Sequence, residues 1–103
     1  MNEILIFAGT TEGRELSECL ANAKMSHTIC VATEYGEVVL GGHPYATIHQ
    51  GRMDEKAMLV FMQRGEYALV VDATHPYATV VTENIKAAAK ACDMPYLRLL
   101  RDT

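Results

Sequence analysis

Five short segments of the chain are apolar at consecutive positions, and longer segments with a different spacing separate them. The five segments are residues 4–7, 28–32, 46–49, 68–71 and 96–99. Continuous apolar runs, as opposed to alternating ones, are typical of strands in a parallel sheet that helices cover on both faces. The pattern therefore predicts a parallel sheet of five strands.

The intervening segments carry apolar residues at helical spacing. The expected stripes are Leu16, Cys19, Leu20 and Ala23 in a helix over 11–24; Ala57, Val60 and Phe61 in a helix over 54–64; and Val81, Ile85, Ala88 and Cys92 in a helix before Pro95. A short helix is also expected over 35–40. Strands that alternate with helices predict an α/β fold, with an open, doubly wound, five-stranded parallel sheet, Rossmann-like, in three α/β/α layers.

Size and composition restrict the classes of function. The 103 residues (11.4 kDa) allow one domain, 1–103, and the net charge of −4 argues against a nucleic-acid partner. No apolar run approaches the roughly 20 residues that a membrane span needs, and the first residues lack the basic region of a signal peptide. Three cysteines without a CxxC pair indicate reduced thiols and a cytoplasmic location.

Glycines and polar residues gather where the predicted strands end. These segments are 9–14, 33–36, 51–54 and 72–77. The starts of the strands show no comparable cluster. Because ligands of doubly wound sheets bind outside the carboxyl ends of the strands, the asymmetry predicts a ligand site at that edge.

The turn after the first strand is suited to phosphate. Gly9 and Gly13 permit a tight turn and a close backbone approach, and the following helix presents unpaired N–H groups and the positive end of its dipole. The hydroxyls of Thr10 and Thr11 offer further donors. The turn matches neither GxGxxG nor a P-loop. An ordinary strand-to-helix turn, capped by Thr10 or Thr11, remains an equal alternative.

Two charged residues follow the second and third strands. Glu34 stands where dinucleotide folds place an acid on the ribose hydroxyls, and a carboxylate there repels a 2′-phosphate and favours NADH. A solvated carboxylate is the alternative. Arg52 either pairs with a phosphate or folds back onto Asp54.

The turn after the fourth strand carries the other candidates. Asp72 ends a buried strand and is expected to accept bonds from neighbouring backbone N–H groups. Pro76 holds His75 out of helical geometry, so that the imidazole can bind a ligand or move a proton. The alternative is that Asp72 only orders the turn and His75 caps it. No metal site is expected, because no metal-ligand spacing joins the cysteines to His27, His43 and His49.

Several segments, in this order, resemble the amino-terminal half of the precorrin-6A reductase family. They are 4–14 (ILIFAGTTEGR), 31–36 (VATEYG), 51–52 (GR), 72–78 (DATHPYA) and 95–98 (PYLR). The family reduces one double bond of a corrin-precursor macrocycle with a nicotinamide nucleotide. The VATEYG segment looks more like the oxygen-independent branch of the cobalamin pathway, whose substrate already carries cobalt.

The resemblance implies a role for each candidate. The dinucleotide would be held by Gly9, Thr10, Thr11, Glu12, Gly13 and Arg14. Its adenosine end would lie near Thr33, Glu34, Tyr35 and Arg52. Two further cofactor-binding residues would be Asp72 and Thr74. The candidates for catalysis, beside the nicotinamide and the tetrapyrrole substrate, are His75 and Tyr77. The cofactor would be NADH or NADPH, with NADH favoured by Glu34.

Members of that family are longer and have a second domain that closes over the site. The resemblance therefore implies that this chain lacks a carboxy-terminal domain and that the isolated chain has negligible reductase activity. Two alternatives stay open. One is a flavodoxin-like electron carrier, in which Tyr35 or Tyr77 stacks on FMN; the other is a nucleotide-binding module without catalysis.

Overall fold

The structure of the protein, a computed structural model, describes residues 3–32 and 45–100. Its elements in chain order are β1 (Glu3–Ala8), α1 (Thr11–Asn22), β2 (His27–Val31), β3 (Ala46–Gln50), α3 (Glu55–Arg64), β4 (Tyr67–Ala73), α4 (Thr79–Ala91) and β5 (Tyr96–Arg98). The short helix expected over 35–40 lies outside the described residues.

The five strands form one parallel sheet in the order β3-β2-β1-β4-β5. The chain leaves β1 towards β2 on one side and later adds β4 on the other side of β1. Strand order therefore reverses between β1 and β4, which is the switch point at which doubly wound folds bind ligands. Flavodoxin-like sheets follow the order 2-1-3-4-5, so the topology contradicts the flavodoxin-like alternative.

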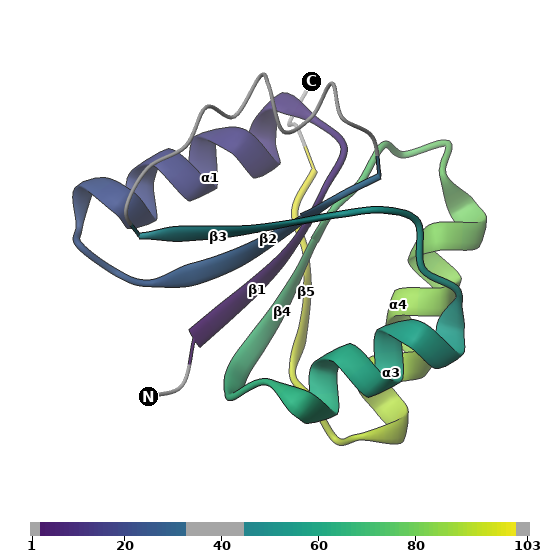
Figure 1. Ribbon diagram of the computed structural model, residues 1–103. Coiled ribbons are helices and arrows are strands. Elements are labelled where there is room, and N and C mark those ends of the chain that lie inside the picture. Colours follow the sequence, from purple (N-terminus) through teal and green to yellow (C-terminus); the bar gives the residue numbers. More distant parts are fainter. Residues whose placement is uncertain (1–2, 33–44, 101–103) are drawn as a thin grey trace.

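Helices cover both faces of the sheet, and the predicted three layers are confirmed (Figure 1). Successive residues of β1 point to opposite faces, as the twofold period of a strand requires. Leu5 and Phe7 pack in the cluster beneath α3 and α4, while Ile6 packs in the cluster beneath α1. The continuous apolar run of this strand follows from burial on both faces.

The buried face of α1 differs from the predicted stripe. It consists of Gly13, Ser17 and Leu20, whereas Cys19 and Ala23 are exposed. A Cβ atom at Gly13 would lie 3.1 Å from the Cβ atoms of both Ala8 and Ala73. The helix therefore approaches the sheet too closely for large side chains at its amino end, and small residues face inward there.

The stripe on α3 is also rotated from the prediction. Met58 and Met62 are buried in the core, while Val60 is about half exposed and Phe61 only partly buried. The flexible methionine side chains fill the space between α3 and the sheet. On α4 the predicted Ile85 and Ala88 are buried, whereas Val81 is exposed and Cys92 is only partly buried. No helix in the described part of the chain has the length and apolar character needed to cross a bilayer.

The cysteines should differ sharply in reactivity. Cys19 is exposed, whereas burial raises the pKa of Cys30 to about 12 and keeps its thiol protonated. Because the thiolate is the reactive form, we expect Ellman's reagent to modify Cys19 first in the native protein and Cys30 only upon unfolding. The Cys19→Ser variant should lose the fastest phase of the reaction with Ellman's reagent, and Cys30→Ser should keep that phase. The reverse result would contradict the burial of Cys30.

Candidate functional site

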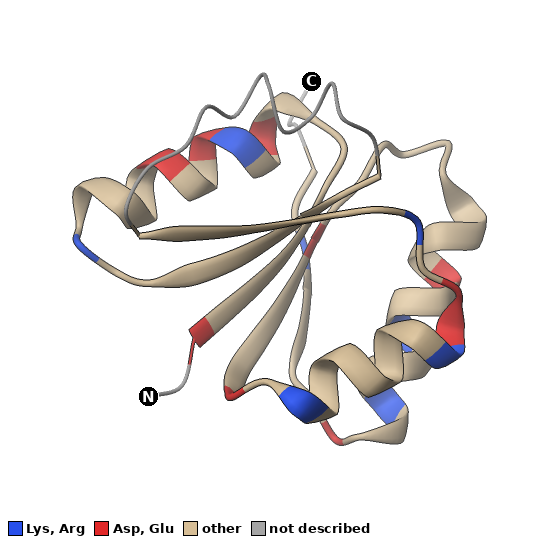
Figure 2. Cartoon of the chain, in the orientation of Figure 1, with Lys and Arg blue, Asp and Glu red and all other residues tan. Residues whose placement is uncertain are grey.

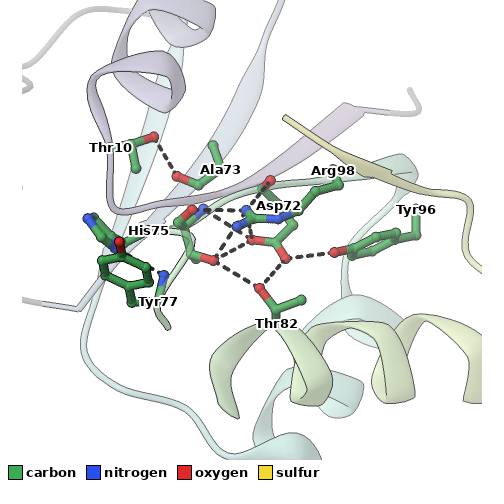
Figure 3. A network of polar contacts seen from close by, with 9 residues as sticks. Thr10, Asp72, Ala73, His75, Tyr77, Thr82, Tyr96 and Arg98 are labelled. Carbon is green, nitrogen blue, oxygen red and sulfur yellow. Dashed lines mark hydrogen bonds and ion pairs between the residues drawn. The ribbon is translucent and has the colours of Figure 1, made fainter. Parts of the chain in front are cut away.

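The turns that follow β1 and β4 lie side by side at the switch point. The two strands are paired up to Ala8 and Ala73, and Thr10 Oγ1 donates a hydrogen bond of 2.7 Å to the Ala73 carbonyl (Figure 3). A Cβ atom at Gly9 would lie 3.4 Å from Thr74 Cα and 3.5 Å from the backbone nitrogen of His75. The adjacency of these turns is the arrangement that the sequence predicted.

The amino terminus of α1 has no side-chain cap from its N-cap residue. Thr10 occupies that position with an extended backbone, but its hydroxyl bonds to Ala73 across the sheet edge. By comparison, Asp54 caps α3 by accepting a bond of 2.8 Å from the Ala57 N–H. The expected alternative of a Thr10 cap is therefore absent, and the positive end of the α1 dipole faces the carboxyl edge without that neutralising contact.

Arg14 adds a cation near the same terminus. The other charged residues of α1 are glutamates (Figure 2). A cation is electrostatically disfavoured near a helix amino terminus, so the helix dipole does not account for this placement. The Nε atom of Arg14 is buried and has no hydrogen-bond partner among residues 3–32 and 45–100. A buried donor without a partner costs about 1–3 kcal/mol, which an anionic acceptor at this terminus would recover.

The carboxylate of Asp72 lies beneath the second turn and accepts five hydrogen bonds (Figure 3). Its Oδ1 atom accepts from Thr74 N at 3.1 Å, from Thr74 Oγ1 at 2.6 Å and from Arg98 Nη1 at 3.1 Å. Its Oδ2 atom accepts from Thr82 Oγ1 at 2.8 Å and from Tyr96 Oη at 2.7 Å. Residues of β4, α4 and β5 thus meet at a single buried group.

These contacts keep Asp72 ionised. Burial by itself raises the pKa of the carboxyl group, but hydrogen bonds from Thr74, Tyr96 and Thr82 outweigh it and leave the pKa below its ordinary value. Burial, together with the bond to Asp72, raises the pKa of Tyr96, so the phenol keeps the proton that it donates. Arg98 supplies the opposite charge.

Asp72 and Thr74 support the turn, and both side chains are buried. Asp72 is 0% exposed and Thr74 is 7% exposed. Of the five donors to Asp72, only Thr74 N is a backbone group, whereas the sequence analysis expected backbone donors in general. Both side chains thus have a supporting role in the turn, and their expected contact with a cofactor stays a prediction.

Three partners of Asp72 were not singled out as site residues from the sequence: Thr82, Tyr96 and Arg98. A weak signal was present for two of them, because residues i and i+2 of a strand share a face, so that Tyr96 and Arg98 point the same way. Their alignment with Asp72 depends on the pairing of β5 with β4. That pairing is a property of the folded sheet.

His75 and Tyr77 are exposed beside the first turn. The Tyr77 backbone N–H donates to His75 Nδ1 at 3.1 Å, and since an N–H can only donate, the neutral ring carries its proton on Nε2. The two rings lie 5.1 Å apart, and Tyr77 is 88% exposed. His75 therefore orders the turn through one nitrogen and presents the other to the outside.

The remaining candidate residues either follow the edge strand β3 or lie outside the described residues. Thr33, Glu34 and Tyr35 are outside the described residues. Arg52 is exposed after β3, and in the described part of the chain it forms no ion pair with Asp54. Within residues 3–32 and 45–100, no group of three or more His, Cys, Asp or Glu side chains could hold a metal ion.

Comparisons with known proteins identify relatives of this arrangement. A cobalt-precorrin-6A reductase of Synechocystis sp. is 29% identical over 98 residues, which cover 95% of this chain and 38% of that protein. A solved structure of CobK precorrin-6A reductase has the same fold, with a TM-score of 0.83 at 24% identity over 99% of this chain and 40% of its own. The chain thus spans about two fifths of the length of these proteins. The family model for precorrin-6x reductase CbiJ/CobK matches residues 3–103, and the chain belongs to that family.

Proposed function

We propose that this chain is the nucleotide-binding part of a reductase that reduces one double bond of a precorrin-6A macrocycle. Precorrin-6x reductases use a nicotinamide cofactor, and the Synechocystis relative is named for the cobalt-containing substrate, which we propose here as well. The observation that carries the proposal is the Thr10–Ala73 hydrogen bond, which holds the two candidate turns together at the switch point. The family supports catalysis over the alternative of a binding module alone.

The residues of the first turn fit the pyrophosphate of a dinucleotide. The amino terminus of α1 offers N–H groups and the positive end of its dipole, and Arg14 Nε offers a donor that no other described residue binds. The absence of a side chain at Gly9 lets the first turn lie close to the backbone of Thr74 and His75. Thr10 holds the turn through Ala73 and thereby fixes the position of the helix terminus.

The residues of the second turn are suited to lie beside the nicotinamide end of the dinucleotide, where the reaction takes place. A reduced nicotinamide supplies a hydride when it is bound. His75 can donate from Nε2 to a ligand at this edge or hold a proton there, because Nδ1 is occupied by the Tyr77 N–H. The exposed Tyr77 ring offers a flat surface against a planar partner. Holding two planar partners in register is the main task of such a site.

We propose NADH as the preferred nucleotide, on sequence grounds. Glu34 follows β2 closely, where an acid bonds the ribose hydroxyls and repels a 2′-phosphate. Calorimetric titration of the full-length protein should show NADH binding about tenfold or more tightly than NADPH. Tighter binding of NADPH would contradict the proposed preference for NADH. Binding of neither nucleotide would remove the proposed function.

Replacement of Arg14 by methionine should weaken nucleotide binding. Loss of a charge-assisted bond to a phosphate costs about 1.5 kcal/mol or more, so we expect a dissociation constant for NADH at least about tenfold higher. Arg64→Met is a matched control, because Arg64 is an exposed arginine at the carboxyl end of another helix, α3, and its replacement should leave the affinity unchanged. Equal affinities of the two variants would show that Arg14 does not contact the phosphates.

A further inference from the structure

The turn after β4 is tied to the rest of the sheet through three successive carbonyl groups. The Asp72 carbonyl accepts from Leu99 N at 2.9 Å and from Arg98 Nη1 at 3.0 Å, and the Ala73 carbonyl accepts from Thr10. The Thr74 carbonyl accepts from Arg98 Nη1 at 2.9 Å. The turn is thus held by the turn after β1 on one side and by β5 on the other.

The same segment is held from beneath through the Asp72 carboxylate. Tyr96 binds it from β5 and Thr82 binds it from α4, while Thr74 binds it from within the turn. Each of these donors has a distance typical of a sound hydrogen bond. The backbone between Asp72 and His75 is therefore fixed from several directions, and His75 follows directly on the last fixed residue.

The polar side chains of strand β5 form their hydrogen bonds with this turn. It has three residues, of which Tyr96 and Arg98 both bind Asp72, while Leu97 on the opposite face is 51% exposed. The Tyr96 ring also packs against the core beneath α4, and its hydroxyl group donates to Asp72. The polar side of this edge strand is thus directed at one turn.

We propose that Tyr96, Arg98 and Thr82 are positioning residues that, through Asp72, set the orientation of His75 at the cofactor edge. None of the three needs to contact a ligand. The inference rests on the proposed function for its kinetic consequence, because a fixed His75 matters to turnover only if the site is a reductase site. Its structural consequence, an ordered His75 ring, is independent of that function.

The test compares Tyr96→Phe and Thr82→Val with the control Ser17→Ala in the full-length protein. Each change removes one hydroxyl from a hydrogen bond of similar length, since Ser17 Oγ lies 2.7 Å from His27 Nε2. Ser17 is buried on α1 and its partner His27 is buried at the start of β2, at the amino end of that strand and outside the Asp72 network. Thr82→Ser restores a hydroxyl at its position and should behave like the wild type.

The first readout is the tautomer of His75, observed by long-range proton–nitrogen NMR of the ring at about pH 8, where imidazoles are neutral. We expect the wild type, Ser17→Ala and Thr82→Ser to show the proton on Nε2. In Tyr96→Phe and Thr82→Val the two tautomers should average, because the Tyr77–His75 bond is no longer held in place. An unchanged His75 signal in both of those variants overturns the inference, whatever the protein catalyses.

The second readout is NADH oxidation with the macrocycle substrate. We expect Tyr96→Phe and Thr82→Val to lower kcat by about tenfold or more, with the KM for NADH within about twofold of the wild type, because misplacement of a catalytic group acts on the chemical step. Ser17→Ala should lower thermal stability alone. Equal kcat values for all variants overturn the inference, whereas a wild type without turnover contradicts the proposed function and leaves the NMR result to decide the positioning role.

Discussion

Replacement of Asp72 by alanine is expected to lower the free energy of unfolding by about 3–5 kcal/mol, which is the usual cost of breaking a buried ion pair from one side. Arg98 would lose the carboxylate that lies 3.1 Å from its Nη1 atom. The hydroxyls of Thr74, Thr82 and Tyr96 would lose their acceptor in a region from which water is largely excluded. Urea unfolding at pH 7 measures the difference.

The Asp72→Asn variant removes the negative charge of the side chain and keeps its shape. An asparagine keeps one acceptor oxygen for Thr74 and Arg98, and the hydroxyls of Thr82 and Tyr96 can rotate to accept from its amide. We expect this variant to lose less stability than Asp72→Ala, because no hydroxyl is left without a partner. An alanine variant as stable as the wild type would show that the five contacts contribute nothing net.

The contribution of Asp72 should also depend on pH. Its pKa is lower in the folded protein than the ordinary value, so the folded state binds the proton less tightly than the unfolded chain does. The stabilisation is therefore complete above a pH of about 4, the ordinary pKa of the carboxyl group, and is lost as the pH falls through the depressed value. The stability difference between the wild type and Asp72→Asn should shrink in urea titrations at about pH 3.

Gly13→Val is expected to destabilise the fold by about 1–3 kcal/mol and to weaken NADH binding by the full-length protein. Helix propensity alone favours valine over glycine by a few tenths of a kcal/mol. Packing makes the net effect on stability unfavourable, because even a Cβ atom at this position would lie 3.1 Å from Ala8 Cβ and from Ala73 Cβ. Both neighbours belong to paired strands of the sheet, so the helix has to move and its amino terminus leaves the switch point.

The matched control is Glu15→Val, an exposed position on the same helix. It introduces the same β-branched residue without a packing conflict, so its stability should change by about 0.5 kcal/mol or less. Urea unfolding and NADH titration of the two variants give both comparisons. A Gly13→Val protein that binds NADH like the wild type would show that the close approach of α1 to the sheet does not serve the nucleotide.

The candidate site was partly accessible from the sequence. The two turns at 9–14 and 72–77 could be placed at one edge because all parallel strands carry their carboxyl ends to the same side. Their direct contact through Thr10 and Ala73 follows from the pairing of β1 with β4. The donors Tyr96 and Arg98 lie 24 and 26 residues from Asp72 in the chain, and no local pattern relates such distant positions.

By itself, the sequence determined the class of the fold and the edge at which the candidate turns meet, because strand and helix periods are local and turn residues mark the strand ends. The tertiary structure alone decided which helix residues face the sheet and what Asp72 does. Small residues face inward on α1 because the helix lies close to β1 and β4, and Asp72 is saturated by side chains that only strand pairing brings together. Contacts of this kind depend on how the elements pack against one another in space. The spacing of residues along a single element does not predict that packing.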